Sequence, residues 1–327
     1  MSALDAVKAQ LAAVQTLQRA RQLGRIASAY LFLGPSGVGK ELTATAIAAD
    51  VVSGGDPHIV DRIKTGAHPD VRVFRPRDEG KRNIQVEVLR NEILPLAQFA
   101  PFEAGSTFFI FPEADVSFPE FQPEAANALL KTLEEPRSNV HFILTSERPD
   151  SLLSTIRSRC QRVRFGRLPP TVLREILLGE ELPETSIVPA IALSAGRADV
   201  ALELARDGTV EELTDLVFSI DEAVRGSGPG TLLDFAEKLG RRDDLELALL
   251  AMQGFYRDLA ITSLRDDPRG LAFPRRGEEL RQRAASVDPS AAAARVSLIH
   301  ACIDSMHQNA NRQVALDSLL FGLRGLR

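Results

Sequence analysis

The run Gly34-Pro35-Ser36-Gly37-Val38-Gly39-Lys40 constrains the fold of this chain more than any other feature. It follows the apolar segment 29–33 and precedes an Ala-rich, periodic segment at 41–52, so it joins an expected strand to an expected helix. This is the G-x-x-x-x-G-K pattern of a P-loop, whose glycines turn backbone N–H groups toward phosphate and whose lysine reaches the β- and γ-phosphates. The pattern predicts a P-loop fold in which the candidate nucleotide-binding residues are Gly34, Gly37, Gly39 and Lys40.

Two positions that should hold Mg²⁺ carry other residues. A working P-loop has Ser or Thr after its lysine, because that hydroxyl ligates the cation, but Glu41 stands here. An Asp is expected directly after the apolar strand 108–111, where this chain has Pro112. Glu41 is either an unusual cation contact or a favourable acidic residue in the first turn of its helix, and Glu113 is either a water-orienting base or structural. The sequence therefore predicts a phosphate loop without its magnesium site.

The first half of the chain alternates between two kinds of segment. A helix is expected at the N-terminus, where Val7, Leu11, Val14 and Leu17 recur at helical spacing. Another helical pattern spans 124–133, and short apolar runs lie at 29–33, 71–74, 108–111, 140–144 and 162–165. Strands that alternate with helices predict an α/β domain whose parallel sheet is covered on both faces.

This alternation ends near Phe165. The run Leu168-Pro169-Pro170 follows as an expected boundary, because proline removes a backbone donor and restricts the residue before it. Beyond it the patterns are helical, with short helices to about residue 207 and longer ones after about 210. We expect an α/β domain at 1–167, a small helical module at 168–208 and a larger helical domain at 209–327.

Composition excludes several classes of protein. The chain carries 39 Lys and Arg against 44 Asp and Glu, a formal charge of −5, which argues against an autonomous, strongly basic nucleic-acid binder. Two cysteines cannot build a disulfide framework or an all-Cys zinc site. The first 22 residues lack the pattern of a signal peptide, and no apolar stretch is long enough to span a membrane. We expect a cytoplasmic protein.

Several further motifs resemble one known family. The segment 29–32 before the P-loop, the run Ala126 to Pro136, the segment 142–145 and the run Thr155 to Gln161 are similar to those of the clamp-loader AAA+ proteins of bacterial replication. The run Asn127 to Pro136 and the triplet Ser158-Arg159-Cys160 carry the most specific likeness. Near the C-terminus, Asn309 to Leu316 resembles the start of the last helix of the family's collar. The resemblance extends from near residue 10 to the end and is strongest up to about 166.

The resemblance implies a RecA-like AAA+ domain, a helical lid and an all-α collar through which five subunits form a ring. It implies γ/τ-like and δ-like subunits as partners, and contact with a sliding clamp and primer-template DNA through the complex. ATP lies at subunit interfaces in this family, and the arginine of the Ser-Arg-Cys triplet, here Arg159, reaches the neighbour's γ-phosphate as an arginine finger. From the residues alone, a surface or strand-flanking arginine of a basic stretch is favoured, because charge runs are usually solvated faces, and it is the resemblance that favours the finger. Thr145 matches a residue that senses the γ-phosphate, or it is a strand-end hydroxyl bonded locally.

The chain also departs from the family pattern. Many members carry a four-cysteine zinc module after the P-loop helix, but the corresponding stretch, about 53–69, has no cysteine, so we expect no zinc. Its Asp56, His58, Asp61 and His68 are expected to be polar loop residues rather than ligands. The lid arginine of active members aligns with Asp199, two residues after Arg197.

The sequence leaves three candidate functions. The first is a clamp-loader subunit of DNA polymerase III that hydrolyses no ATP and needs no cofactor, with ATP binding left open, and completes a neighbour's ATP site with Arg159. The second is an active γ/τ-like ATPase that uses Glu41 and Glu113 in unusual ways. The third, a P-loop enzyme acting on a small molecule, is disfavoured because the helical half shows no catalytic set. A basic patch at Arg275-Arg276 and Arg281-Gln282-Arg283 lies near DNA or a partner, or is a solvated face.

Overall fold

The computed structural model describes residues 2–76, 83–120, 123–180, 182–206, 208–265, 270–308 and 310–326. The chain divides into two compact units, residues 1–168 and 169–327. The division falls within the Leu168-Pro169-Pro170 run. A further division of the second unit at 208/209 stays a prediction. Asn309, the first residue of the C-terminal run, lies outside the described residues.

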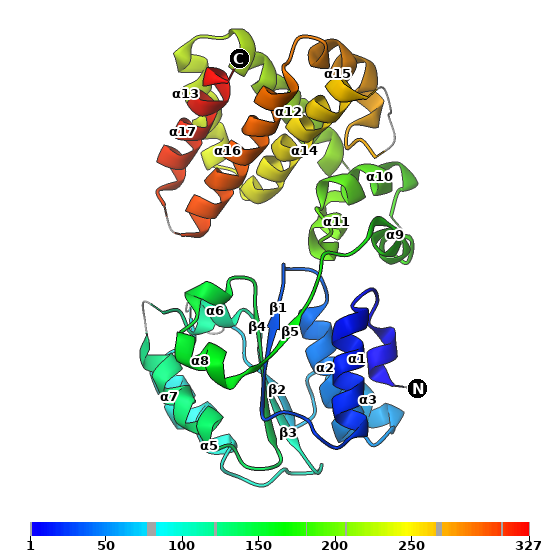
Figure 1. Ribbon diagram of the computed structural model, residues 1–327, viewed down its shortest axis with the longest axis vertical. Coiled ribbons are helices and arrows are strands. Elements are labelled where there is room, and N and C mark those ends of the chain that lie inside the picture. The colour runs from blue at the N-terminus through cyan, green and yellow to red at the C-terminus, as the bar shows by residue number, and fades with distance from the viewer. Residues whose placement is uncertain are drawn as a thin grey trace. The chain divides into compact units, whose positions relative to one another are not determined.

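A parallel sheet of five strands forms the centre of the first unit, in the order β2-β3-β4-β1-β5 (Figure 1). The central strands are almost entirely apolar because both faces of the sheet are covered. The strands are β1 (Ala29–Leu33), β2 (Val71–Val73), β3 (Thr107–Phe111), β4 (Val140–Ser146) and β5 (Gln161–Arg164). The expected α/β architecture is confirmed.

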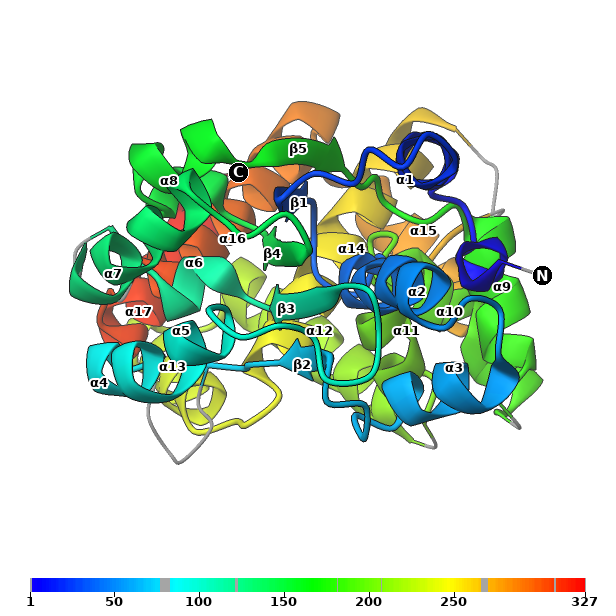
Figure 2. The ribbon, with the colours of Figure 1, turned by 90° about the horizontal axis from the view of Figure 1, so that it is seen from below.

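Helices cover both faces of this sheet (Figures 1 and 2). On one face lie α1 (Leu11–Gln22), α2 (Lys40–Val52) and α3 (Pro57–Lys64). The other face carries α4 (Val86–Val88), η3 (Leu89–Ile93), α5 (Leu94–Leu96), α6 (Ala114–Ser117), α7 (Pro123–Glu134) and α8 (Ser154–Arg159). Leu31, Phe109 and Phe142 belong to the core on this second face, together with apolar side chains of α7 and α8. A short helical turn, η4 (Pro149–Ser151), follows β4.

The N-terminal segment differs from its expected form. The helix α1 begins at Leu11 rather than at Val7, and a separate turn, η1 (Ala3–Ala6), precedes it. Ala9 has a φ of +61° between the two elements, which interrupts a regular right-handed helix. The turn is anchored on α2, because the Asp50 carboxylate accepts hydrogen bonds from the backbone N–H groups of Ala3 and Leu4. This part of the expectation is wrong because tertiary contacts outweigh the apolar spacing.

Among the described residues of the second unit, all regular secondary structure is helical (Figure 1). Its helices are α9 (Pro170–Leu178), α10 (Glu184–Leu193), α11 (Ala198–Leu204), α12 (Thr209–Gly226), α13 (Pro229–Gly240), α14 (Leu245–Leu264), α15 (Gly277–Ala284), α16 (Pro289–His307) and α17 (Arg312–Gly325), with the turn η5 (Pro274–Arg276) before α15. Asp288 and Asn311 cap α16 and α17 by accepting from backbone N–H groups three residues on.

The core of this unit combines long helices with aromatic rings. The helix α14 packs along α16, and α13 packs against α17. Phe218 of α12 and Phe255 of α14 meet edge to face, with ring centroids 4.9 Å apart.

None of the helices formed by the described residues combines the length and the hydrophobicity that a membrane span requires.

Candidate nucleotide loop and Arg159

The P-loop lies where the sequence places it, between β1 and α2. Gly37 and Gly39 have φ values of +63° and +93°, a left-handed conformation that side chains disfavour. Gly34 is needed for a different reason, because a Cβ there would come within 2.4 Å of the Phe165 carbonyl oxygen. The loop is therefore packed against the end of β5.

Gln10 fixes the loop from the N-terminal side. Its Nε2 donates to the carbonyl oxygens of Val38, at 3.1 Å, and Gly166, at 2.8 Å, while the N–H of Gly166 donates to its Oε1 at 3.1 Å. The side chain is buried. The role of Gln10 could not be predicted, because a glutamine before an apolar helical pattern carries no signal of its own. Its carboxamide joins the P-loop to the segment that leaves β5.

Lys40 is turned back onto its own loop. Its Nζ donates to the carbonyl oxygen of Gly34 at 2.7 Å and to that of Pro35, and the residue is only 8% exposed. These contacts satisfy donors that a P-loop lysine gives to phosphate. A nucleotide bound in this loop has to replace them.

Glu41 is directed toward the sheet edge. Its carboxylate forms an ion pair with Arg75, which follows β2. Both residues line a polar cavity of about 550 Å³ between α2, α3 and β2. An arginine partner competes with any cation for this carboxylate, which favours a structural role for Glu41 over a metal contact.

The end of β3 offers no carboxylate at the position of the missing Asp. Pro112 is buried there, and Glu113 follows with a φ of +47°. Asp115 is buried and anchors the segment after β4, because its carboxylate accepts from the Glu147 N–H at 3.3 Å and from Arg148 Nε at 3.2 Å. Asp115 is thus used for loop structure.

Thr145 and Ser146 end β4 beside the P-loop. Thr145 is buried opposite Phe32, and the Ser146 carbonyl oxygen accepts from the N–H of Gly34 at 3.2 Å. The two hydroxyls lie on opposite faces of the sheet, since side chains alternate along a strand. The Ser146 hydroxyl is buried and has no hydrogen-bond partner among the described residues. Thr145 was among the predicted site residues, whereas Ser146, its neighbour at the strand end, was not.

Arg159 is the last residue of α8. Its Nη1 donates to the Thr155 carbonyl oxygen at 3.0 Å, and its Nη2 pairs with the Glu134 carboxylate at the end of α7. The side chain remains 34% exposed. The next residue, Cys160, is buried, and burial raises the pKa of its thiol to about 12, so it is not a nucleophile at neutral pH. Of these two neighbouring residues, only Arg159 has a side chain that is accessible to solvent.

Two of the four polar side chains singled out in the stretch 53–69, Asp56 and His68, make local structural contacts. Asp56 caps α3 by accepting from the N–H of His58 at 2.9 Å. His68 is buried, and its Nδ1 accepts from the N–H of Asp70 at 3.1 Å. Among the residues that the structure describes, no three His, Cys, Asp or Glu side chains are grouped to hold a metal ion. The absence of zinc stays a prediction.

Arg197, near the expected position of the lid arginine, is engaged within the second unit. Its Nη1 lies 2.6 Å from Glu246 Oε1, and its Nη2 lies 3.2 Å from Asp199 Oδ2. Asp199, which aligns with the family's arginine, is therefore a partner of Arg197 in an ion pair.

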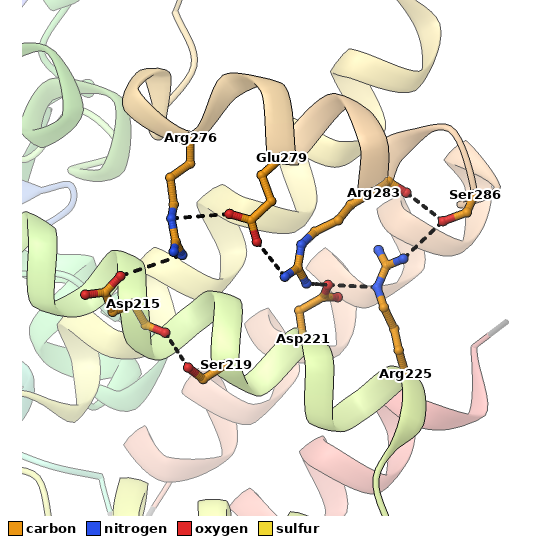
Figure 3. A network of polar contacts seen from close by, with 8 residues as sticks. All are labelled: Asp215, Ser219, Asp221, Arg225, Arg276, Glu279, Arg283 and Ser286. Carbon is orange, nitrogen blue, oxygen red and sulfur yellow. Dashed lines mark hydrogen bonds and ion pairs between the residues drawn. The ribbon is translucent and has the colours of Figure 1, made fainter.

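The basic patch at 275–283 is compensated by acidic residues (Figure 3). Arg276 Nη1 lies 3.6 Å from Asp215, and Arg283 Nη1 lies 2.6 Å from Asp221, both on α12. Arg275 pairs with Glu211 and Arg281 with Glu278. The guanidinium carbons of Arg276 and Arg283 also lie 4.5 Å and 5.0 Å from the ring centre of Phe218. These pairings favour a compensated face, which holds α15 on α12, over a DNA-binding patch.

Comparison with known proteins gives consistent likenesses. The family model described as "DNA polymerase III, delta subunit" matches residues 9–169. The DNA polymerase III subunit delta′ of Bacillus subtilis is 25% identical over 315 residues, which cover 92% of each chain. The delta′ subunit of Haemophilus influenzae is 31% identical over 218 residues, 64% of each chain. A DNA polymerase III gamma subunit-related protein of Thermotoga maritima aligns with a TM-score of 0.47 and 19% identity, covering 95% of this chain and 99% of that one.

Proposed function

This chain belongs to the delta′ family of DNA polymerase III clamp-loader subunits, and from that premise we propose that it supports clamp loading without hydrolysing ATP itself. Its P-loop serves as a structural element of the AAA+ domain. Its contribution to hydrolysis is Arg159, which completes the ATP site of a neighbouring subunit.

The observation that carries this proposal is the replacement of both magnesium ligands. Glu41 is paired with Arg75, and the buried Pro112 has no side-chain oxygen. Hydrolysis in P-loop proteins depends on a cation that bridges the β- and γ-phosphates and neutralises developing charge. With the two ligand positions changed and Lys40 bonded to the loop, this site is a phosphate cradle without the means to activate the γ-phosphate.

Arg159 suits the role of an arginine finger by its place and its chemistry. It ends a short helix, is partly exposed, and carries a planar guanidinium that matches phosphate geometry. A guanidinium supplied in trans stabilises the charge of the transition state and can raise the rate of hydrolysis by about 10³-fold or more. We propose γ/τ-like and δ-like subunits as partners in a pentamer, with clamp and primer-template DNA contacted through the complex in the cytoplasm.

Binding and turnover of ATP by the purified chain test the proposal, with and without Mg²⁺ and beside a Lys40→Ala control. We expect no turnover and no Mg²⁺-dependent binding. Binding that is indifferent to Mg²⁺ agrees with a cradle kept for structure. Turnover that Lys40→Ala abolishes would overturn the proposal and support an active γ/τ-like ATPase, the alternative favoured by the intact glycines and lysine of the loop.

A further inference from the structure

The guanidinium of Arg159 is held from two sides. Its Nη1 donates to the Thr155 carbonyl oxygen at 3.0 Å, one helical turn earlier in α8, and Ser158 Oγ lies 3.5 Å from the same nitrogen. Its Nη2 pairs with Glu134, which comes from a different helix. The contact with Thr155 orients the side chain along its own helix, and the contact with Glu134 fixes the direction of the guanidinium across the gap between α7 and α8.

Helix stability does not explain the position of Glu134. It is the last residue of α7, where the helix dipole disfavours a negative charge. Its ion pair is also partly exposed, with 34% of the Arg159 side chain and 47% of the Glu134 side chain accessible, and such pairs add little to stability. What the pair does change is the freedom of a long arginine side chain, which loses many rotamers when two nitrogens are bound.

We propose that Glu134 is a positioning residue for Arg159, which holds the guanidinium ready to meet the phosphate of a neighbouring subunit's nucleotide. The inference rests on the proposed function of Arg159. A group that is already oriented loses less entropy when the transition state forms, so its benefit lies in the rate of hydrolysis rather than in nucleotide affinity.

The chain offers a matched control in Glu135. This residue directly follows the end of α7 and is exposed, and among the described residues no ion pair of its carboxylate is found. Glu134→Gln and Glu135→Gln therefore remove the same charge from the same helix end. In the assembled loader we expect Glu134→Gln to lower kcat for ATP by about two- to fivefold with KM unchanged, the range that an exposed ion pair supports. Glu135→Gln leaves both constants unchanged.

A double-mutant cycle separates positioning from a structural effect. In an Arg159→Ala loader, Glu134→Gln should cause no further loss, because the side chain that it positions is gone. An effect that persists in that background, or equal effects of Glu134→Gln and Glu135→Gln, would overturn the inference while the finger stands. If Arg159→Ala alone leaves turnover unchanged, the finger itself fails, and the positioning role fails with it.

Discussion

Gly34 lies against Phe165 so closely that a Cβ on the glycine would come within 2.4 Å of the phenylalanine's carbonyl oxygen. The first glycine of the P-loop is thus required by the end of β5, whether or not a nucleotide is ever bound. The loop can keep its sequence for the sake of the fold.

Gly34→Ala should destabilise the first unit by about 1–3 kcal/mol, because backbone atoms have to move to admit the methyl group. The free energy of unfolding in urea measures the loss. Gly105→Ala is the control, since an added Cβ at this exposed residue meets no atom within 4 Å. Equal stability of the two variants would show that the contact between Gly34 and Phe165 relaxes freely.

Arg159→Ala should slow ATP hydrolysis by the assembled loader at least tenfold while assembly is unaffected, because a transition-state contact is lost and an exposed side chain is removed. Arg157→Ala is the matched control. Arg157 lies in the same helix and pairs with Asp150 at 2.6 Å, a contact with no proposed catalytic part. Steady-state turnover and size-exclusion chromatography give the two readouts. Unchanged turnover with Arg159→Ala would remove the finger role.

Asp221→Ala should destabilise the second unit by about 3 kcal/mol, because the buried carboxylate is the shared partner of Arg225, at 2.8 Å, and Arg283, at 2.6 Å. Removal breaks both ion pairs and leaves Arg283 with Glu279 and Arg225 with Ser286 (Figure 3). Glu237→Ala is the control, since its pair with Arg241 is exposed on α13 and should change stability by less than about 0.5 kcal/mol. Urea unfolding compares the two, and similar losses would contradict the assignment.

His141 should make the first unit less stable below neutral pH. It is buried in β4, its ring stacks on Phe108, and its Nδ1 lies 3.0 Å from the Ala27 carbonyl oxygen. Burial lowers the pKa of His141 below the ordinary 6.5, because the charged form is poorly solvated. As the pH falls from about 6.5 toward that lowered pKa, the unfolded chain binds a proton that the folded chain does not, so stability declines by up to about 1.4 kcal/mol per pH unit.

His141→Gln should flatten this decline, since a neutral amide can still donate to the carbonyl oxygen and does not titrate. Melting temperatures at pH 7.0, 6.0 and 5.0 test the expectation. His300→Gln, at an exposed position of α16, should retain the decline of the parent chain. A slope that survives His141→Gln would assign the pH dependence to other groups.

The spacing of apolar residues and the positions of proline and glycine were sufficient to predict most of the secondary structure. The apolar runs became the strands of the sheet, and 124–133 became α7 with one residue added at each end. Prolines and glycines marked the end of the α/β unit because they act locally. The start of α1 was missed because Gln10 is drawn to Val38 and Gly166, contacts that lie 28 and 156 residues away in the chain.

The candidate site was only partly accessible from sequence. The P-loop and the Ser-Arg-Cys triplet are local motifs, so their residues could be named. The pairing of Glu41 with Arg75 and that of Arg159 with Glu134 join different helices and strands, and no spacing rule predicts which side chains meet. The ion pairs of the 275–283 patch could not be predicted for the same reason, since most of the acidic residues that pair with its arginines lie in α12.

The pairing of Glu41 with Arg75 has a consequence for the evolution of such a subunit. A magnesium site would need a hydroxyl at 41 and a carboxylate at 112, and either change alone yields an incomplete site. A change at 41 alone also removes the ion pair between Glu41 and Arg75. Under the proposed function, neither single change restores a complete magnesium site, so a return to hydrolysis requires both changes together.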